Sequence, residues 1–280
     1  MLQLVNGGNV MKRIYIIVIT VICAMAVFGC GKKETSGNLI GGKGVYEAEY
    51  FERDISGEND SVTKTISIDF MGKNYQMEYY KTRESYIVPY VANEYRDGNN
   101  SIKVVEDSQS ISSFRSELYY GNEEERNYSL PLLTEDELRT IADEYASKVI
   151  DVQEYQVEVK DEAEYNAYQY SYTRYIDGYE TSDYFKVTLS NRGELLEYRD
   201  SLMRNMEYVS LEGFDKEKAY DAVKEALKEY RPDAYVDTFV PEAEILTLTE
   251  DNEIAFYYRA TVVIDKEGGY REAIPVRLIW

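Results

Sequence analysis

Alternation of apolar and polar positions predicts strands along the first part of the folded chain. Lys64 to Phe70 and Asn74 to Tyr80 alternate on either side of a short turn that contains glycine. Ser101 to Val105 and Ile111 to Arg115 form a second pair of short alternating runs, which predicts another hairpin. We therefore assign residues 45–130 to a mostly β region.

Helical spacing replaces this alternation after Leu133. Thr134 and Glu137 have the spacing of a capping box, with Thr at the N-cap and Glu three residues later, and apolar residues recur at helical intervals as far as Ile150. Gly178 and Gly193 are expected to supply positive φ in the two turns that follow. The strands joined by these turns are predicted as a meander of Glu164–Ile176, Tyr184–Leu189 and Glu194–Arg199.

The same order, a helix and then strands, recurs in the last part of the chain. Asp215 is expected to cap a second helix, with Phe214 as a hydrophobic staple, and Pro232 stops it. The strands predicted after it are Ile245–Thr249, Ile254–Ile264 and Tyr270–Ile279. This order predicts an α+β fold class, with tandem helix-plus-antiparallel-meander units at residues 131–206 and 207–280 after the mostly β region.

The first residues have the pattern of a bacterial lipoprotein signal peptide. A short basic segment, Met11-Lys12-Arg13, precedes the apolar run Ile14 to Phe28, which is short for a membrane-spanning helix. The run ends in Val27-Phe28-Gly29-Cys30, which resembles a lipobox. We expect residues 1–29 to be a signal peptide, with translation starting at Met11, and Cys30 to carry a lipid. The alternative is an uncleaved anchor with a chance cysteine.

This lipid would hold the protein on the extracytoplasmic face of the bacterial cytoplasmic membrane. Residues 30–44 are polar and contain glycine, which is typical of a flexible tether between an anchor and a folded domain. The membrane is thus an expected partner, reached through the lipid on Cys30.

Composition narrows the chemistry of the folded part. The chain has no histidine, and both of its cysteines, Cys23 and Cys30, lie in the first thirty residues. The folded part therefore lacks the usual general base, zinc ligands and thiol nucleophile. Among 52 acidic residues no spacing singles out a catalytic pair, although a carboxylate-dependent hydrolase stays an alternative. We expect no enzyme activity, cofactor or metal site. The net charge of -21 argues against nucleic acid as a partner.

Tyrosine is unusually frequent, with 29 copies against 8 of phenylalanine. Tyr168, Tyr170 and Tyr172 project to one face of a predicted strand. Such a row could bind peptide or glycan if exposed, or could pack beneath the helix that starts at Thr134, whose apolar stripe needs cover. The candidate binding residues are Tyr168, Tyr170, Tyr172, Arg174, Tyr175 and Tyr179.

The segment from Leu133 to Ser201 resembles a PepSY-type domain, found in bacterial envelope lipoproteins and in prosegments of secreted metalloproteases. The residues that carry the likeness are the capped helix, the run Tyr172-Thr173-Arg174-Tyr175-Ile176-Asp177-Gly178, and then Val187, Leu189, Gly193, Leu196 and Tyr198. The resemblance implies a small cystatin-like unit.

The tandem layout behind an anchor is also similar to Yyc-type accessory proteins, which restrain sensor kinases at the membrane. This likeness implies a non-catalytic, protein-binding or regulatory role in the envelope, with a sensor kinase or a protease as partner. The alternative is a peptide- or glycan-binding lipoprotein that uses a tyrosine-lined surface.

Overall fold

The computed structural model describes residues 39–51, 56–84, 88–98, 100–119, 129–265, 267 and 269–280. The predicted signal peptide and Cys30 lie outside these ranges. Strands hold 52% of the described residues and helical segments 18%, with two α-helices among them. The predicted α+β class, with tandem helix-plus-meander units, is therefore wrong. The protein is mostly β and is built on one mixed sheet of 14 strands.

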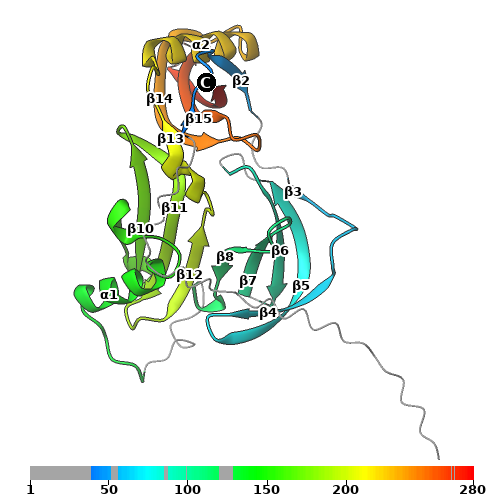
Figure 1. Ribbon diagram of the computed structural model, residues 1–280, viewed down its shortest axis with the longest axis vertical. Coiled ribbons are helices and arrows are strands. Elements are labelled where there is room, and N and C mark those ends of the chain that lie inside the picture. Colours follow the sequence, from blue (N-terminus) through cyan, green and yellow to red (C-terminus); the bar gives the residue numbers. More distant parts are fainter. Residues whose placement is uncertain are drawn as a thin grey trace, which may run out of the picture.

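Eight long strands make up the larger part of this sheet. They are β5 (Lys73–Glu84), β6 (Val91–Asp97), β7 (Asn100–Val105), β8 (Ile111–Arg115), β9 (Gln156–Glu162), β10 (Ala167–Ile176), β11 (Tyr179–Ser190) and β12 (Leu195–Asp200). They pair in the order β5-β6-β7-β8-β12-β11-β10-β9, and all neighbours are antiparallel (Figure 1). The regions predicted at 45–130 and 131–206 thus share one sheet and meet where β8 pairs with β12.

The first strands curve back over this sheet. β4 (Thr65–Phe70) pairs with the first half of β5, and β3 (Ser56–Gly57) pairs near its end. The Phe70 ring on β4 packs on Phe114 of β8 and Tyr198 of β12, with ring centroids 5.0 and 5.3 Å apart. Aromatic packing between strands that are not neighbours therefore closes one core of the protein.

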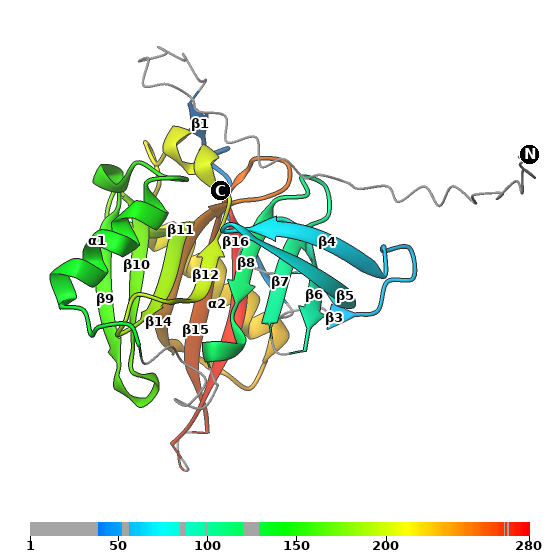
Figure 2. The ribbon, with the colours of Figure 1, turned by 90° about the horizontal axis from the view of Figure 1, so that it is seen from below.

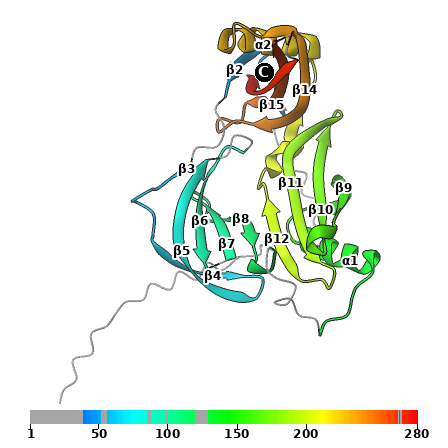
Figure 3. The ribbon, with the colours of Figure 1, turned by 180° about the vertical axis from the view of Figure 1, so that it is seen from behind.

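The remaining strands extend the sheet at the other end. They are β14 (Tyr235–Leu248), β15 (Ile254–Asp265), β16 (Tyr270–Ile279) and β2 (Glu47–Tyr50), paired in that order. β14 joins the eight-stranded run through a short parallel contact with β11, which makes the sheet mixed. Apart from this sheet, β1 (Ile40–Gly41) pairs with β13 (Val209–Ser210). Figure 3 shows β2, from near the start of the described chain, beside α2 at the top.

Helix α1 (Glu135–Ala146) begins at the predicted capping box. The Thr134 hydroxyl accepts a hydrogen bond from the Glu137 N–H, and the Glu137 carboxylate accepts one from the Thr134 N–H. The helix covers β10 and β11 (Figure 2), with Leu138 and Ala142 fully buried against them. It ends four residues before Ile150, which still packs in the same core.

Helix α2 (Lys216–Tyr230) begins at Asp215, as predicted, and packs on β2, β14 and β16. The Asp215 carboxylate accepts hydrogen bonds from the backbone of Glu217 and Lys218. Short 3-10 helices lie at Glu117–Tyr119, Val152–Glu154, Ala163–Tyr165 and Arg204–Tyr208. Within the described ranges, neither α-helix is both long and apolar enough to cross a membrane.

The fold class was missed because its deciding features are not local. β9 is mostly exposed and has only two apolar residues, Val157 and Val159, so its apolar pattern is short. β14 begins ten residues before the predicted strand at Ile245. Strand β8 pairs with β12, although the paired residues Arg115 and Glu197 are 82 positions apart. This pairing merges the predicted separate regions into one sheet.

Candidate functional site

The tyrosine row on β10 lies mostly inside the protein. Tyr170 and Tyr172 are 1% and 0% exposed beneath α1, and Tyr168 is partly buried against the same core. The Tyr172 hydroxyl donates to the Asp143 carboxylate at 2.7 Å. Burial raises the pKa of Tyr170 to about 12, and its hydroxyl has no hydrogen-bond partner among the described residues. These side chains pack the sheet against the helix rather than form an exposed row.

Tyr175 and Tyr179 lie apart from that row, on either side of the turn between β10 and β11. Tyr175 is 40% exposed, whereas the Tyr179 ring packs edge-on against Phe214, just before α2. Lys216 of α2 lies over the Tyr179 ring at 5.2 Å and donates to Glu244 of β14 at 3.0 Å. The hairpin thus holds the eight-stranded run against α2 and β14.

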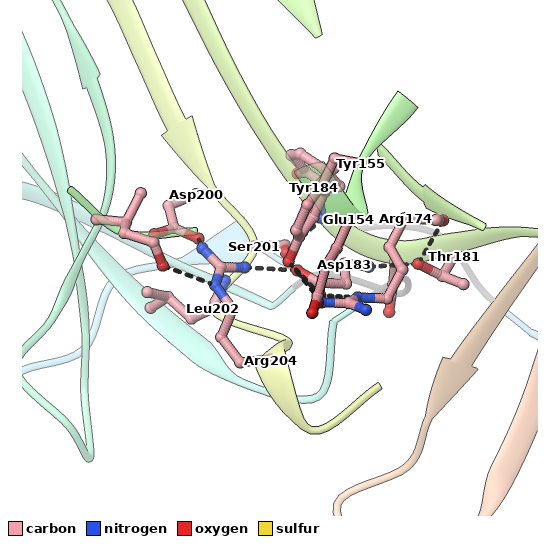
Figure 4. Close-up of polar contacts among 12 residues, drawn as sticks. Glu154, Tyr155, Arg174, Thr181, Asp183, Tyr184, Asp200, Ser201, Leu202 and Arg204 are labelled. Atoms are coloured by element: carbon pink, nitrogen blue, oxygen red, sulfur yellow. Dashed lines mark hydrogen bonds and ion pairs between the residues drawn. The ribbon is translucent and has the colours of Figure 1, made fainter. Parts of the chain in front are cut away.

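Arg174, the remaining predicted site residue, belongs to a buried ion-pair network (Figure 4). Asp183, which is fully buried, accepts hydrogen bonds from Arg174 at 3.0 Å, from the Tyr155 hydroxyl at 2.7 Å and from Arg204 at 2.5 Å. Arg204 also donates to Asp200 at 2.5 Å. Because both oxygens of Asp183 are satisfied by donors from separate elements, the network stabilises one arrangement of β10, β11 and the segment after β12.

A charged groove of about 410 Å³ lies beside this network. Residues of β6, β7, β8 and β12 line it at alternate positions, while the residues between them, such as Tyr95, Ile102 and Phe114, face the core under α1. The groove is therefore on the face of the sheet opposite α1. We call it the arginine groove, and its basic residues are Arg83, Arg96, Lys103, Arg115 and Arg199.

Two buried carboxylates fix the guanidinium groups of this groove. Glu94 is 3% exposed and accepts from Arg83 at 2.9 Å and from Arg96 at 2.5 Å. Glu197 is also 3% exposed and lies 2.7 Å from a guanidinium nitrogen of Arg115 and 2.7 Å from one of Arg199. Each carboxylate thus holds two cations, which leaves one positive charge in excess within each clamp.

The electrostatics at Glu94 follow from this geometry. Burial by itself would raise the pKa of the carboxyl, but the hydrogen bonds and charges of Arg96 and Arg83 outweigh it and lower the pKa below its usual value. The carboxylate therefore stays ionised at neutral pH and keeps both guanidinium groups oriented.

Lys103 lies between the two clamps, on β7. It is half-buried, and among the described residues its ammonium group makes no hydrogen bond or ion pair. Burial and the neighbouring charge of Arg83 lower its pKa. The groove is consequently rich in donors. Its buried carboxylates, Glu94, Glu197 and Asp200, are each paired with arginine, and Glu84 lies exposed at its edge. The groove is therefore complementary to an anionic ligand.

A repeated tetrapeptide marks the site in the sequence, and the sequence analysis missed it. Glu-Tyr-Arg-Asp occurs at residues 94–97 on β6 and at 197–200 on β12. In both copies the glutamate and arginine form a clamp, and the tyrosine, Tyr95 or Tyr198, faces the core. The overall acidity of the chain concealed a local cluster of basic side chains, because cross-strand pairing brings that cluster together.

Part of this sheet is similar to a known family. Residues 68–202 match the model of DUF4901, described as the YcdB, YcdC repeated domain. The match is just under half of the chain, covers β5 to β12 with both Glu-Tyr-Arg-Asp copies, and includes the segment Leu133 to Ser201 that resembles a PepSY-type domain.

A solved structure, the Bacillus megaterium YpeB C-terminal domain, aligns with 79% of this chain and 89% of that chain, at 9% identity and a TM-score of 0.31. A comparison with curated proteins gives no match. Within the described ranges, no group of three or more acidic side chains could hold a metal ion.

Proposed function

We propose that this protein is a lipid-anchored, non-catalytic binding module of the bacterial cell envelope, whose arginine groove binds an acidic segment of a protein partner. The observation that carries the proposal is the pair of clamps, Glu94 and Glu197, each of which fixes two arginines on one sheet face. Pre-oriented guanidinium groups bind carboxylates with little further loss of side-chain entropy, so this face is suited to recognition.

The location and the kind of partner rest on the sequence. The lipobox-like Val27-Phe28-Gly29-Cys30 supports a lipid anchor on the extracytoplasmic face of the membrane. The likeness of Leu133 to Ser201 to PepSY-type domains supports a regulatory role, with a sensor kinase or a protease as partner. The match of residues 68–202 to the YcdB, YcdC repeated domain supports a regulatory or binding role outside the cytoplasm.

A binding role fits the chemistry of the groove better than catalysis does. The sequence has no histidine, and its only cysteines precede the folded part. The buried carboxylates Glu94 and Glu197 are each paired with two arginines, and the buried Asp200 is paired with Arg204, so none of the three is placed to act as a base or nucleophile. The alternative of a tyrosine-lined site for peptide or glycan loses its basis, because Tyr170 and Tyr172 are buried.

The partner can be tested by affinity capture from detergent-solubilised membranes. The double variant Arg96→Gln/Arg199→Gln removes one arginine from each clamp and leaves the other to neutralise the carboxylate. The matched control is Arg277→Gln, which removes an arginine paired with Glu49 in the C-terminal part. We expect the wild type and the control to retain one envelope protein, and the groove variant to retain at least about tenfold less of it.

Equal recovery by the groove variant and the wild type would remove the groove from the proposal. Failure of the wild type to retain any envelope protein above background would contradict the proposed function as a whole. The anchor is tested separately: mass spectrometry of the protein extracted from membranes is expected to show Cys30 as the first residue and carrying a lipid, and an unmodified Cys30 would contradict lipidation.

A further inference from the structure

We infer that the centre of the arginine groove is a binding site for a phosphoryl group. This site lies within the groove proposed to dock a protein partner and shares Arg115 with one clamp, but it adds Lys103, Ser101 and Ser113 and does not depend on that partner. A phosphoryl ligand would occupy the position between the two clamps, and so would compete with an acidic segment for the same face.

Four side chains form the proposed site at the corners of a rectangle on β7 and β8. Lys103 lies opposite Ser113, and Ser101 lies opposite Arg115. Residues opposite each other on neighbouring strands are about 5 Å apart, and residues two apart along a strand are about 7 Å apart. Donors at such corners surround an anion whose oxygens accept hydrogen bonds at about 2.8 Å.

Three of these four side chains have hydrogen-bond donors that are not in use. Among the described residues, neither the Ser101 hydroxyl, the Ser113 hydroxyl nor the Lys103 ammonium group makes a hydrogen bond to a protein atom. The fourth corner, Arg115, is oriented by Glu197 at 2.7 Å. The site therefore places two hydroxyl groups and one ammonium group, whose donors are unused, beside the guanidinium group of Arg115 on the same wall of the groove.

The charge around this site favours an anion with more than one negative charge. Lys103 has Arg83, Arg199 and Arg115 as charged neighbours, against Glu94 as its carboxylate neighbour, and the lowered pKa of Lys103 reflects burial together with this crowding. An anion at the centre would relieve the repulsion among the four cations. The rim of the groove adds Tyr90 and Tyr184, whose hydroxyls extend the set of polar groups.

The number and direction of the donors distinguish a phosphoryl group from a carboxylate. A carboxylate presents two oxygens in one plane, whereas a phosphate monoester presents three terminal oxygens on different sides and carries a charge of about -1.5 to -2 at neutral pH. Donors on two strands, two residues apart on each, match the second shape. Inorganic phosphate and an esterified phosphoryl group share this chemistry.

The test is calorimetric titration of the full-length protein in a non-ionic detergent, at constant ionic strength. The probes are inorganic phosphate, glycerol 3-phosphate and, for comparison, acetate. We expect saturable binding of at least one phosphoryl probe, at least about tenfold tighter than acetate. Lys103→Met is expected to weaken it by about tenfold or more, while Lys224→Met, a lysine on α2, leaves it unchanged.

The double variant Ser101→Ala/Ser113→Ala keeps every charge and provides a second test if Lys103→Met does not fold. It is expected to weaken binding of the phosphoryl probe about tenfold and to leave acetate binding unchanged. Tighter binding of glycerol 3-phosphate than of inorganic phosphate would identify an esterified source, and the reverse order would identify the free ion.

Absence of saturable binding by both phosphoryl probes would overturn the inference, and so would wild-type affinity in the Lys103→Met and the double serine variants. Either outcome leaves the partner capture experiment with the clamp variants unaffected. Failure of the wild type to retain any envelope protein, with its phosphate binding intact, would instead contradict the proposed function alone.

Discussion

At the scale of the residue, two tyrosines of β10 share one environment and differ in a single contact. Tyr170 and Tyr172 are both buried under α1, but among the described residues only the Tyr172 hydroxyl has a hydrogen-bond partner, Asp143. A buried hydroxyl without a partner costs the desolvation of that group, whereas a hydrogen bond to a carboxylate more than offsets it.

The two tyrosines therefore respond differently to removal of the hydroxyl. Tyr172→Phe is expected to lower the free energy of unfolding by about 1–2 kcal/mol, because it leaves Asp143 without this donor. Tyr170→Phe, the matched control, is expected to change it by less than about 0.5 kcal/mol or to raise it slightly. Urea unfolding followed by circular dichroism measures both. Equal losses in the two variants would contradict the assigned contacts.

The clamp at Glu94 makes stability depend on pH. Because Arg96 and Arg83 lower the pKa of Glu94 in the folded protein, its stabilising contribution is complete above the usual carboxyl pKa and is lost as pH falls through the lowered value. Glu94→Gln is expected to cost about 2 kcal/mol at neutral pH and clearly less near about pH 3. Urea unfolding at the two pH values measures the difference. A cost that does not change with pH would argue against an ionised Glu94 in the folded state.

At the scale of the element, the sequence predicted what local chemistry determines. The capping box at Thr134 and the cap at Asp215 are confirmed, and so are the positive φ values of Gly178 and Gly193 in the turns on either side of β11. These features depend on residues within a few positions of each other. They fix where α1, α2 and the turns begin, but not which strands pair.

Alanine substitutions at the two turn glycines distinguish the effect of backbone strain from the effect of steric crowding. A Cβ at Gly193 would lie 2.9 Å from a Leu133 methyl and 3.0 Å from an Ile141 methyl, whereas one at Gly178 would meet no atom within 4 Å. Both have positive φ. Gly178→Ala is expected to cost about 1–2 kcal/mol, and Gly193→Ala about 2–4 kcal/mol, in thermal or urea unfolding. A larger cost at Gly178 would be incompatible with the packing of α1 over the β11–β12 turn.

The arginine groove lies beyond what such local patterns reveal. Lys103 and Ser113 become neighbours only through the β7–β8 register, and Arg115 meets Glu197 only because β8 pairs with β12. The sequence did contain one sign of the groove, the Glu-Tyr-Arg-Asp repeat, whose alternate charges mark a polar strand face. A search for internal repeats identifies such a site even where total charge points the other way.

At the scale of the whole molecule, the first residues of the described chain pack against its last residue. β1 pairs with β13, and Gly42 lies directly against the indole ring of Trp280, which is 3% exposed. The Tyr46 hydroxyl accepts a hydrogen bond from the backbone of Asp215 at 2.7 Å, at the beginning of α2. The segment that would follow the tether is therefore part of the C-terminal core rather than of the neighbouring strands β3 and β4.

Gly41 and Gly42 provide a matched pair of positions at which the contact with Trp280 can be tested. A Cβ at Gly42 would overlap the Trp280 ring, while one at Gly41 would meet nothing within 4 Å. Gly42→Ala is expected to lower the free energy of unfolding by about 1–3 kcal/mol and to shift tryptophan fluorescence, since Trp280 is the only tryptophan. Gly41→Ala is expected to do neither. An unchanged fluorescence spectrum in Gly42→Ala would contradict this contact.

The pairing of β8 with β12 also sets the order in which the molecule can be completed. During synthesis, β8 (Ile111–Arg115) is made before its partner strand β12. The paired residues Arg115 and Glu197 are 82 positions apart in the sequence. Until the two strands pair, β8 is an open edge, and closing such a long loop is a slow step. The arginine groove contains residues from strands on both sides of the β8–β12 pairing, so it forms only after these two strands have paired. A ligand of the groove would therefore bind fully folded molecules in preference to partly folded ones.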